Sequence, residues 1–293
     1  MKPWENHPVE LPDGRLICAP HGLVVRGRCC VDYSFMDEVL QDSGGENSDE
    51  DNKLYNELSP GGRAAIDARW GPPSTGTGRV LPTVFIPSSS SSKPEDLFPA
   101  GKAREAIPYV PRFIHRYNPK TFLIYTDGAC LNNGQANPRA GWACIFRPLT
   151  PTPTTIIAGS LEHKGPFGDS HNQTSNRAEL RAVLGALRFR HWPGEGFTTL
   201  VIATDSEYVV KGATEWVQGW LRKGWRTSVG GQVKSKDLWE ALLGEMERWD
   251  KFGLKVQFWR IPREWNVDAD LAAKEAAQGD DVDTWREVSG VLC

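Results

Sequence analysis

The sequence predicts an α/β fold with a mixed five-stranded sheet flanked by helices, built from residues 111–293. Five apolar runs of strand length occur in this part of the chain, and helical patterns lie between and after the later runs. The first three runs follow one another with only turns between them, so they should form an antiparallel meander. The later runs alternate with helices, which is typical of strands added in parallel.

Each expected element corresponds to a short stretch of the chain. The five strands, in chain order, are FLIYTD, GWACIF, TIIAGSL, TLVIATD and LKVQFWRI. The turn RPLTPTPT joins the second strand to the third. The helical patterns are SNRAELRAVLGALRFRHW, DLWEALLGEMERWD and NVDADLAAKEAAQ.

Two segments precede this domain and differ from it in composition. Residues 1–35 form a short Cys/His-containing segment, and residues 36–110 form an acidic, Ser/Pro-rich and largely flexible linker. Between Met36 and Glu57 eight acids stand against one cation, Lys53, and such a block buries too little apolar surface to stay ordered. The later run SSSSSKPEDLFP also has the composition of a linker.

Composition also bounds the class and location of the protein. The formal net charge is -3, so any basic surface for nucleic acid must be local. No apolar run approaches the ~18 residues of a membrane helix, so we expect no membrane contact. The start MKPWENHPVELPDG has no signal or transit peptide pattern. We therefore expect an intracellular protein, in the nucleus and/or cytoplasm, whose six cysteines are thiols.

Four carboxylates stand out by position, although each has an ordinary explanation. Asp127 and Asp205 come at the ends of two apolar strands, where Asp-Gly is a common turn and Asp or Ser is a good helix cap. Glu179 lies in the first crossover helix, where an acid is usually solvated surface. Asp270 lies in the first turns of the last helix, for which Asn266 is the better cap candidate.

Taken together, the four acids indicate a metal site. Strand ends collect the functional residues of an α/β sheet, and two of the acids lie there. A cluster of carboxylates is electrostatically unfavourable unless cations lie among them. Hard oxygen ligands suit Mg²⁺, and two such ions ~3.5–4 Å apart can activate a water and stabilise the leaving oxygen of a phosphodiester.

The stretches TDGAC, NRAEL, TDSEYVVKG and NVDADLA, in this order and spacing, resemble the four acid-bearing motifs of the type 1 ribonuclease H family. The resemblance covers roughly Phe122 to Gln278 and implies the ribonuclease H-like fold. It also implies that Asp127, Glu179, Asp205 and Asp270 hold two Mg²⁺ or Mn²⁺ ions. The implied activity is endonucleolytic hydrolysis of the RNA strand of RNA/DNA hybrids, giving 5′-phosphate and 3′-hydroxyl ends, and the family-like oligomeric state is a monomer.

The same resemblance implies residues that contact the hybrid. By position, Cys130, Asn132 and Asn133 would lie along the minor groove, where the 2′-hydroxyl distinguishes RNA from DNA. Ser175 and Asn176 would contact the hybrid close to the scissile phosphate. Thr174 and Ser235 would hold a phosphate of the DNA strand.

A basic and aromatic segment between Lys211 and Lys236 points to phosphate binding on its own composition. It contains six cations and one acid, Glu215, in a chain of negative net charge. Trp216 and Trp220 are four residues apart on one helix face, and Trp225 follows in the next loop. Packing in the core is the alternative role for these tryptophans, and for Trp216 the two roles are equally supported.

Two features depart from the family pattern. Arg260 stands where the family usually has a histidine before the last helix; arginine can hold a phosphate but cannot move protons near neutral pH, so we expect lower turnover. No hybrid-binding module is recognisable at the N-terminus. Instead, four residues there could hold a structural Zn²⁺, with buried or free thiols as the alternative, because adjacent cysteines chelate poorly: Cys18, His21, Cys29 and Cys30.

Two other functions remain open from the sequence. The first is a hybrid-binding protein that has lost useful catalysis, which Arg260 favours and the four acids oppose. The second is another metal-dependent nuclease on the same scaffold, such as an exonuclease. The tryptophan-rich basic segment opposes this second function, because it suits an internal duplex better than a strand end. The sequence also leaves open whether the C-terminal stretch DDVDTWREVSGVLC docks on the domain.

Overall fold

A computed structural model of the chain describes residues 71–89, 91–103, 110–148 and 156–288, and the backbone of four short strands before them. These strands form two antiparallel pairs: β1 (Pro8–Glu10) with β2 (Leu16–Cys18), and β3 (Val25–Arg26) with β4 (Val31–Asp32). Cys18 ends β2, whereas His21, Cys29 and Cys30 lie outside the described residues. The zinc site therefore stays a prediction.

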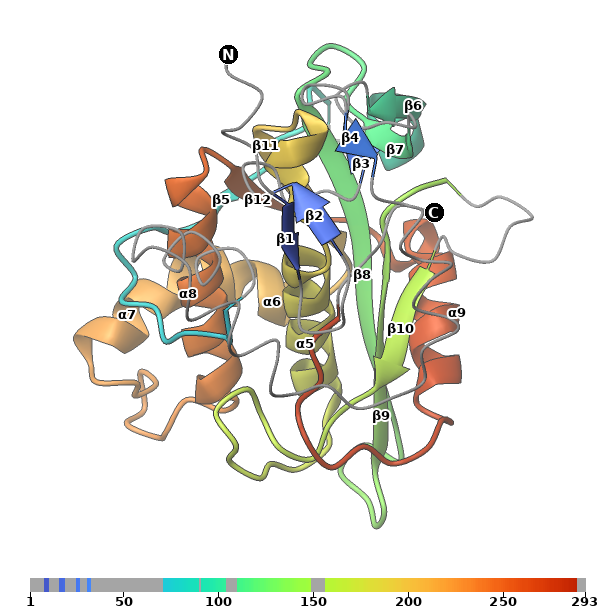
Figure 1. The fold of residues 1–293 in the computed structure, drawn as a ribbon. Helices are drawn as coiled ribbons and strands as arrows, with labels where there is room; N and C mark the ends of the chain where they lie inside the picture. Colours follow the sequence, from blue (N-terminus) through green and yellow to red (C-terminus); the bar gives the residue numbers. More distant parts are fainter. Residues whose placement is uncertain are drawn as a thin grey trace.

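A mixed sheet forms the centre of the domain (Figure 1). Its five predicted strands are β8 (Thr121–Leu131), β9 (Arg139–Ile145), β10 (Ile156–Ser160), β11 (Thr199–Thr204) and β12 (Lys255–Arg260). Strands β8, β9 and β10 are antiparallel neighbours, while β11 is parallel to both β8 and β12. The predicted meander followed by parallel additions is confirmed.

The sheet is wider than the sequence predicts, because three more strands join it. They are β5 (Thr83–Val84), which pairs in parallel with β12, β6 (Ala100–Ala103), and β7 (Val110–Ile114), which lies between β6 and β8. A short helix, α4 (Pro94–Leu97), precedes β6. The described part of residues 71–103 thus packs on the domain, although it falls within the segment predicted as largely flexible linker.

The reason for this difference lies in a few apolar side chains spaced between the serines and prolines. Leu97 and Phe98 are buried in a cluster with Trp259. The Phe85 ring lies 5.1 Å from the Trp259 ring and 5.5 Å from that of Phe98. The average composition of the segment is that of a linker, so it does not reveal these side chains. The three groups Phe85, Leu97 and Phe98 bury enough apolar surface to hold the short segment against the sheet.

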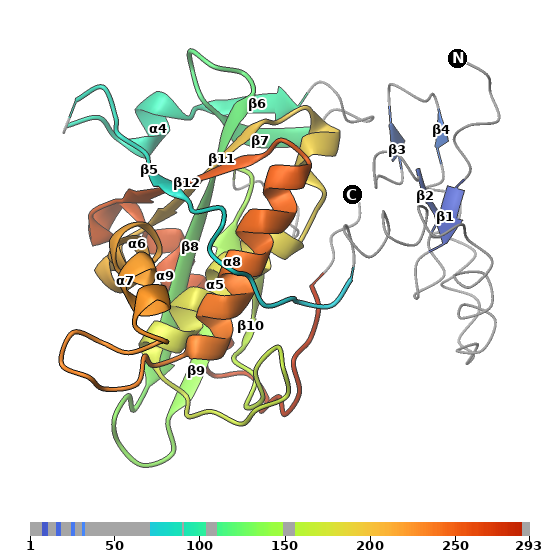
Figure 2. The same ribbon diagram turned by 90° about the vertical axis from the view of Figure 1, so that its left-hand side faces the viewer.

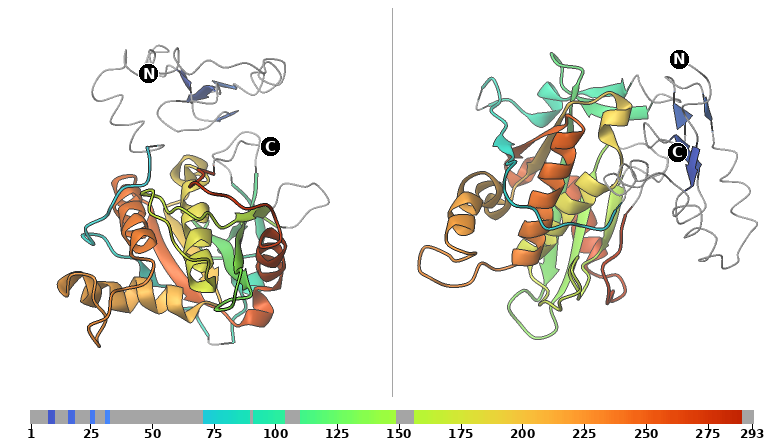
Figure 3. Two further views of the ribbon diagram at one scale, coloured as in Figure 1. Left: turned by 90° about the horizontal axis from the view of Figure 1, so that it is seen from below. Right: turned by 60° about the vertical axis from the view of Figure 1, so that its left-hand side comes forward.

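Helices cover both faces of the sheet (Figures 2 and 3). On one face lie α5 (Ser175–Arg188) and α8 (Lys236–Lys251), packed over Phe122, Ile124 and Ile202. On the other lies α9 (Val267–Ala276), with α4 beside it, facing residues of the alternate set such as Leu123. The period of two along each strand therefore separates two apolar layers.

The remaining short elements connect the larger ones. They are η1 (Trp192–Glu195), α6 (Glu207–Lys211), η2 (Gly212–Trp216), α7 (Val217–Arg222) and η3 (Arg263–Trp265). Elements α6, η2 and α7 run on as one helical stretch that carries the first part of the basic and aromatic segment. In the described part of the chain, no helix has the length and apolar character needed to span a membrane.

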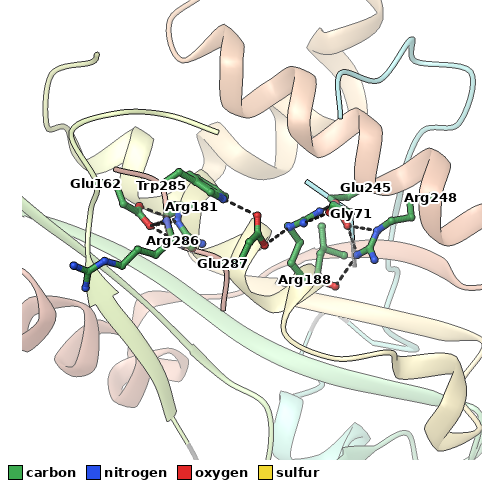
Figure 4. Close-up of polar contacts among 10 residues, drawn as sticks. Gly71, Glu162, Arg181, Arg188, Glu245, Arg248, Trp285, Arg286 and Glu287 are labelled. Atoms are coloured by element: carbon green, nitrogen blue, oxygen red, sulfur yellow. Dashed lines mark hydrogen bonds and ion pairs between the residues drawn. The ribbon is translucent and has the colours of Figure 1, made fainter. Parts of the chain in front are cut away.

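The C-terminal stretch, as far as Val288, docks on α5 (Figure 4). The guanidinium of Arg181 lies over the rings of Trp142 and Trp285, 4.3 and 4.0 Å from their centroids. The same group donates to both oxygens of Glu162 and to the Arg286 carbonyl. Buried arginine needs such full pairing, so this segment satisfies a charge that would otherwise be costly inside the protein.

A second buried arginine on α5, Arg188, contacts three further segments of the chain (Figure 4). Its guanidinium contacts Glu245 of α8, binds Glu287 at 2.7 Å, and donates to the Gly71 carbonyl at 2.7 Å. Gly71 and the C-terminal stretch therefore meet on one side chain.

Candidate active site

Three of the four predicted carboxylates come together where β11 ends beside β8. Asp127 was predicted at the end of a strand, but β8 continues past it to Leu131. Asp127 lies in β8, Glu179 in α5, and Asp205 directly after β11. One oxygen from each lies within 4.8 Å of the others. Three acids from three separate elements thus form one constellation of oxygen donors.

Local structure explains why these side chains can meet. A Cβ on Gly128 would lie 2.1 Å from the backbone nitrogen of Glu179, so only glycine lets α5 approach β8 this closely. Asp205 is not the cap of α6, because the neighbouring Ser206 accepts the hydrogen bond from the Val209 amide. Its carboxylate is therefore left for the site.

The side chain of Asn266 does not form the helix cap that the sequence predicts. It occupies the cap position of α9, but its side chain makes no capping hydrogen bond. Instead, the amide nitrogen donates to the Thr126 carbonyl at 3.0 Å and to Asp205 Oδ1 at 3.3 Å. Asn266 thus links the start of α9 to β8 and orients the carboxylate of Asp205.

The fourth predicted acid, Asp270, is close to the other three but is held by cations. Its two oxygens accept hydrogen bonds from Arg263 and Lys274. Burial alone would raise the pKa of Asp270, yet these two partners hold it below its usual value. The Arg263 Nε also lies 4.0 Å from Asp205 Oδ2, a link that the sequence analysis missed; its only signal was the arginine in the loop WRIPREWN.

The cations near the three carboxylates do not fully neutralise the negative charge of the cluster. Burial, and next the charge of Asp205, raise the pKa of Asp127 to about 7. Burial, with Asp127 and Asp205, raises the pKa of Glu179 well above its ordinary value. Within the described ranges, the buried Oε2 of Glu179 has no hydrogen-bond partner. Oxygen donors with excess charge and one orphaned buried oxygen fit a divalent cation.

The residues predicted to contact the minor groove and the scissile region gather beside these acids. Asn133 Nδ2 donates to Ser175 Oγ at 3.1 Å, which joins the loop after β8 to the start of α5. Cys130 is half-buried near the end of β8, and Asn132 follows with a φ of 53°. Asn176 is exposed on the first turn of α5. The structure therefore brings the predicted positions to one surface, and their contacts with a hybrid stay a prediction.

Thr174 caps the helix that carries Glu179. Its hydroxyl accepts a hydrogen bond from the Arg177 amide at 3.3 Å. Ser235, two residues before Asp237, has a φ of 54° and precedes α8 without capping it. Both predicted phosphate-binding positions thus lie at helix starts, where backbone N–H groups favour anions.

The basic and aromatic segment forms a hollow of about 560 Å³. Trp216, 37% exposed, and Trp220 line it together, with ring centroids 5.9 Å apart. Trp220 also packs against the buried Trp239 at 5.3 Å, so it combines the core role with the surface role. Four cations line the same hollow: Arg222, Lys223, Arg226 and Lys234.

Trp225 and Arg260 lie outside that lining. Trp225 is partly buried, with a φ of 62°, and Lys236 Nζ lies 6.0 Å from its ring centroid. Arg260, 55% exposed at the end of β12, pairs with Glu207 Oε2 at 3.2 Å. Arg260 is thus directed toward α6, and a role for it in holding phosphate stays a prediction.

Comparison with known proteins agrees with this arrangement. A model of the RNase H family matches residues 119–278. "Ribonuclease H" of Hahella chejuensis is 43% identical over 131 residues, which cover 45% of this chain and 76% of the relative. Human "Ribonuclease H1" is 33% identical over 178 residues, covering 59% of this chain and 56% of that protein. A crystal structure of LC11-RNase H1 with an RNA/DNA hybrid has a TM-score of 0.36 and 23% identity, covering 53% of this chain and 95% of that one.

Proposed function

The chain belongs to the RNase H family and is a ribonuclease H, and we propose that it cleaves the RNA strand of RNA/DNA hybrids endonucleolytically with two divalent cations. The products would be 5′-phosphate and 3′-hydroxyl ends. The observation that carries the proposal is the constellation of Asp127, Glu179 and Asp205, whose oxygens lie within 4.8 Å of one another. Three acids at that spacing are costly without bound cations, and two-metal sites hydrolyse phosphodiesters.

The three acids would hold Mg²⁺ or Mn²⁺, with Asp270 as a fourth ligand. The metals, when bound, supply the activated water and neutralise charge on the leaving oxygen. Asp127 would contribute a donor held in place by the ladder with β9, in which it pairs with Ala143. Glu179 contributes its unpartnered oxygen. Asn266 keeps Asp205 in one orientation through its amide.

Asp270 can bind a metal only if Arg263 and Lys274 release its oxygens. Arg263 and Lys274 hold both of its oxygens, and Arg263 also approaches Asp205. A metal bound between these carboxylates would replace the guanidinium as their counter-charge. We infer that Arg263 stabilises the metal-free cluster and competes with the metal for it.

Binding of the hybrid would use two surfaces. The linked pair Asn133 and Ser175 lies at the acid cluster and offers amide and hydroxyl groups to the minor groove. The hollow lined by Trp216 and Trp220 offers apolar ring faces among cations. Positive charge concentrated in this segment would attract the phosphates of the DNA strand, although the net charge of the whole chain is negative.

Cleavage of a labelled RNA/DNA hybrid in Mg²⁺ tests the proposal, with wild type beside Asp127→Asn. Glu264→Gln is the matched control, because it removes an exposed acid of the neighbouring loop that lies outside the cluster. We expect metal-dependent cleavage of the hybrid's RNA strand only, retained by the control and lost in Asp127→Asn. Duplex RNA, duplex DNA and single-stranded DNA should remain intact.

The same experiment separates the two rival functions. Tight binding of the hybrid without cleavage in either Mg²⁺ or Mn²⁺ would indicate a binding protein and contradict the proposal. Degradation from strand ends, or of single-stranded DNA, would indicate a different nuclease. Phosphatase treatment of the products before end-labelling identifies the 5′-phosphate.

A further inference from the structure

A second pocket lies on the face of the sheet that carries α4 and α9. Its volume is about 310 Å³, at the lower end of the ~300–1,000 Å³ of small-ligand sites. Three aromatic side chains from three different segments line it: Phe113 of β7, Tyr125 of β8 and Trp265 of η3. All three side chains pack on the core but are partly exposed, so part of each ring remains accessible to a ligand.

The aromatic rings are arranged as walls rather than as a stack. Phe113 and Tyr125 have centroids 5.2 Å apart and planes at 85° to each other. Trp265 comes from the loop before α9 and bounds the same space. The buried Ile145 and Ala269 complete the apolar lining. In this edge-to-face pair the edge of one ring meets the face of the other, so only the ring faces that remain uncovered can attract a cation.

Both charged residues that line this pocket are acids. Glu95 belongs to α4 and Asp268 to the first turn of α9, and both are exposed. Glu95 has a surface partner, since Lys93 Nζ lies 3.6 Å from it. Asp268 forms no ion pair with any residue in the described part of the chain.

The neighbouring arginines do not fill the pocket. Arg263 is engaged with Asp270 and Asp205 at the carboxylate cluster. The guanidinium of Arg147 lies over Phe146, whose ring packs with Phe189 in the core layer under α5. Among the described residues, no arginine or lysine lines the pocket itself.

We propose that this pocket binds an organic ammonium cation, such as the methylated ammonium head of a lysine side chain or of a small free amine. Aromatic walls attract such a cation through their faces, and the acids at the rim add Coulombic attraction. The same acids oppose a nucleotide, whose phosphate would meet like charge. A neutral apolar ligand would cover the carboxylates without pairing them, which is unfavourable.

A neutral isostere provides the sharpest test. Choline and 3,3-dimethyl-1-butanol have the same shape, but only choline carries a positive charge. In ligand-observed NMR titrations of the full chain, we expect saturable choline binding and binding of the isostere that is about tenfold weaker. Nα-acetyl-trimethyllysine amide, run in parallel, distinguishes a protein side chain from a free amine: tighter binding than choline assigns the former.

Variants locate the binding in this pocket. Asp268→Asn should weaken choline binding about two- to fivefold, whereas Glu264→Gln, which removes an exposed charge from the same loop outside the pocket, should leave it unchanged. Tyr125→Phe should bind choline as the wild type does, and Tyr125→Leu should lose binding. Thermal unfolding of each variant confirms that it is folded.

Three results would overturn the proposal. The first is equal affinity for choline and its neutral isostere, which would mark an ordinary apolar pocket. The second is the lack of saturable binding of both choline and the trimethyllysine probe. The third is an identical effect of Asp268→Asn and Glu264→Gln, which would place any binding elsewhere. The pocket adjoins the carboxylate cluster through Asn266, which lines it, but none of these results is read from cleavage, so they can fail separately from the proposed activity.

Discussion

Arg177 and Asp237 join the first turns of α5 and α8 through two parallel hydrogen bonds of 2.8 and 2.6 Å, and both side chains are buried. His171 adds a third contact, with its Nε2 3.3 Å from the same carboxylate. Thr174 lies three residues before Arg177, and Ser235 two before Asp237. The pair therefore fixes the separation of the two helix starts that are predicted to hold phosphate.

Replacing Arg177 with lysine should weaken hybrid binding more than catalysis. Lysine keeps the charge but cannot make the two parallel hydrogen bonds, so the helix starts would lose their fixed spacing. We expect KM for the hybrid to rise about three- to tenfold with a smaller change in kcat. Asp237→Asn leaves a buried cation unpaired and should cost about 3–5 kcal/mol of unfolding free energy. The exposed pair Lys164–Asp283 is the control, and its disruption should change neither quantity measurably.

Mg²⁺ should stabilise the protein more at high pH than at low pH. The pKa of Asp127 is about 7 in the fold and about 3.9 in an unfolded chain. Between these values the folded state keeps a proton that the unfolded state has lost, so metal-free stability falls as the pH rises through this window. We expect Mg²⁺ to raise Tm by about 5 °C at pH 8 and by about 1–2 °C at pH 5. An equal shift at both pH values, or an undiminished shift in Asp127→Asn, would contradict the metal assignment.

Removing the Arg263 charge should make the metal bind more tightly. Its guanidinium contacts Asp270 and lies 4.0 Å from an Asp205 oxygen, so it competes with a divalent cation for the same donors. For Arg263→Gln we expect the Mg²⁺ concentration at half-maximal cleavage to fall about two- to fivefold. Arg286→Gln, which removes an arginine of the C-terminal stretch, is the comparison. A higher Mg²⁺ requirement in Arg263→Gln would show that the guanidinium assists metal binding instead.

Arg260→His tests whether a titratable group at this position raises turnover. Histidine can accept and donate protons near neutral pH, and it would also release Glu207 from its 3.2 Å ion pair. We expect kcat to rise by about tenfold, less than the ~10²-fold that a fully positioned acid–base group contributes. Arg260→Lys should not increase kcat, because lysine stays charged. An unchanged kcat in both variants would show that this position does not limit the reaction.

The sequence predicted those parts of the molecule that depend on regular burial. Strands such as β8 alternate between two apolar layers, as their period of two predicts. The meeting of the acids was predicted from strand ends and from the family motifs, and β8 continues past Asp127 to Leu131, so Asp127 lies within its strand. The sequence did not reveal the role of Asn266. An asparagine directly before a helix can cap that helix or bond a distant carboxylate such as Asp205, and the sequence is the same in both cases.

Features assembled from distant segments were the ones that the sequence did not reveal. The ion pairs that occupy Asp270 depend on how the loop at Arg263 folds back, and no spacing rule gives that. The ammonium pocket draws its rings from three elements and its acids from two others, so no single stretch carries its signature. The anchoring of Phe85 and Phe98 depends on a partner, Trp259, more than 150 residues later in the chain.

Arg188 brings Gly71 and Glu287, which lie more than 200 residues apart in the sequence, next to each other on α5. Closing such a long loop costs conformational entropy that grows only slowly with its length, and one guanidinium secures the closure. New termini at an exposed turn outside the site, such as the one around Gly168, with a short peptide joining residues 71 and 288, should therefore preserve the fold.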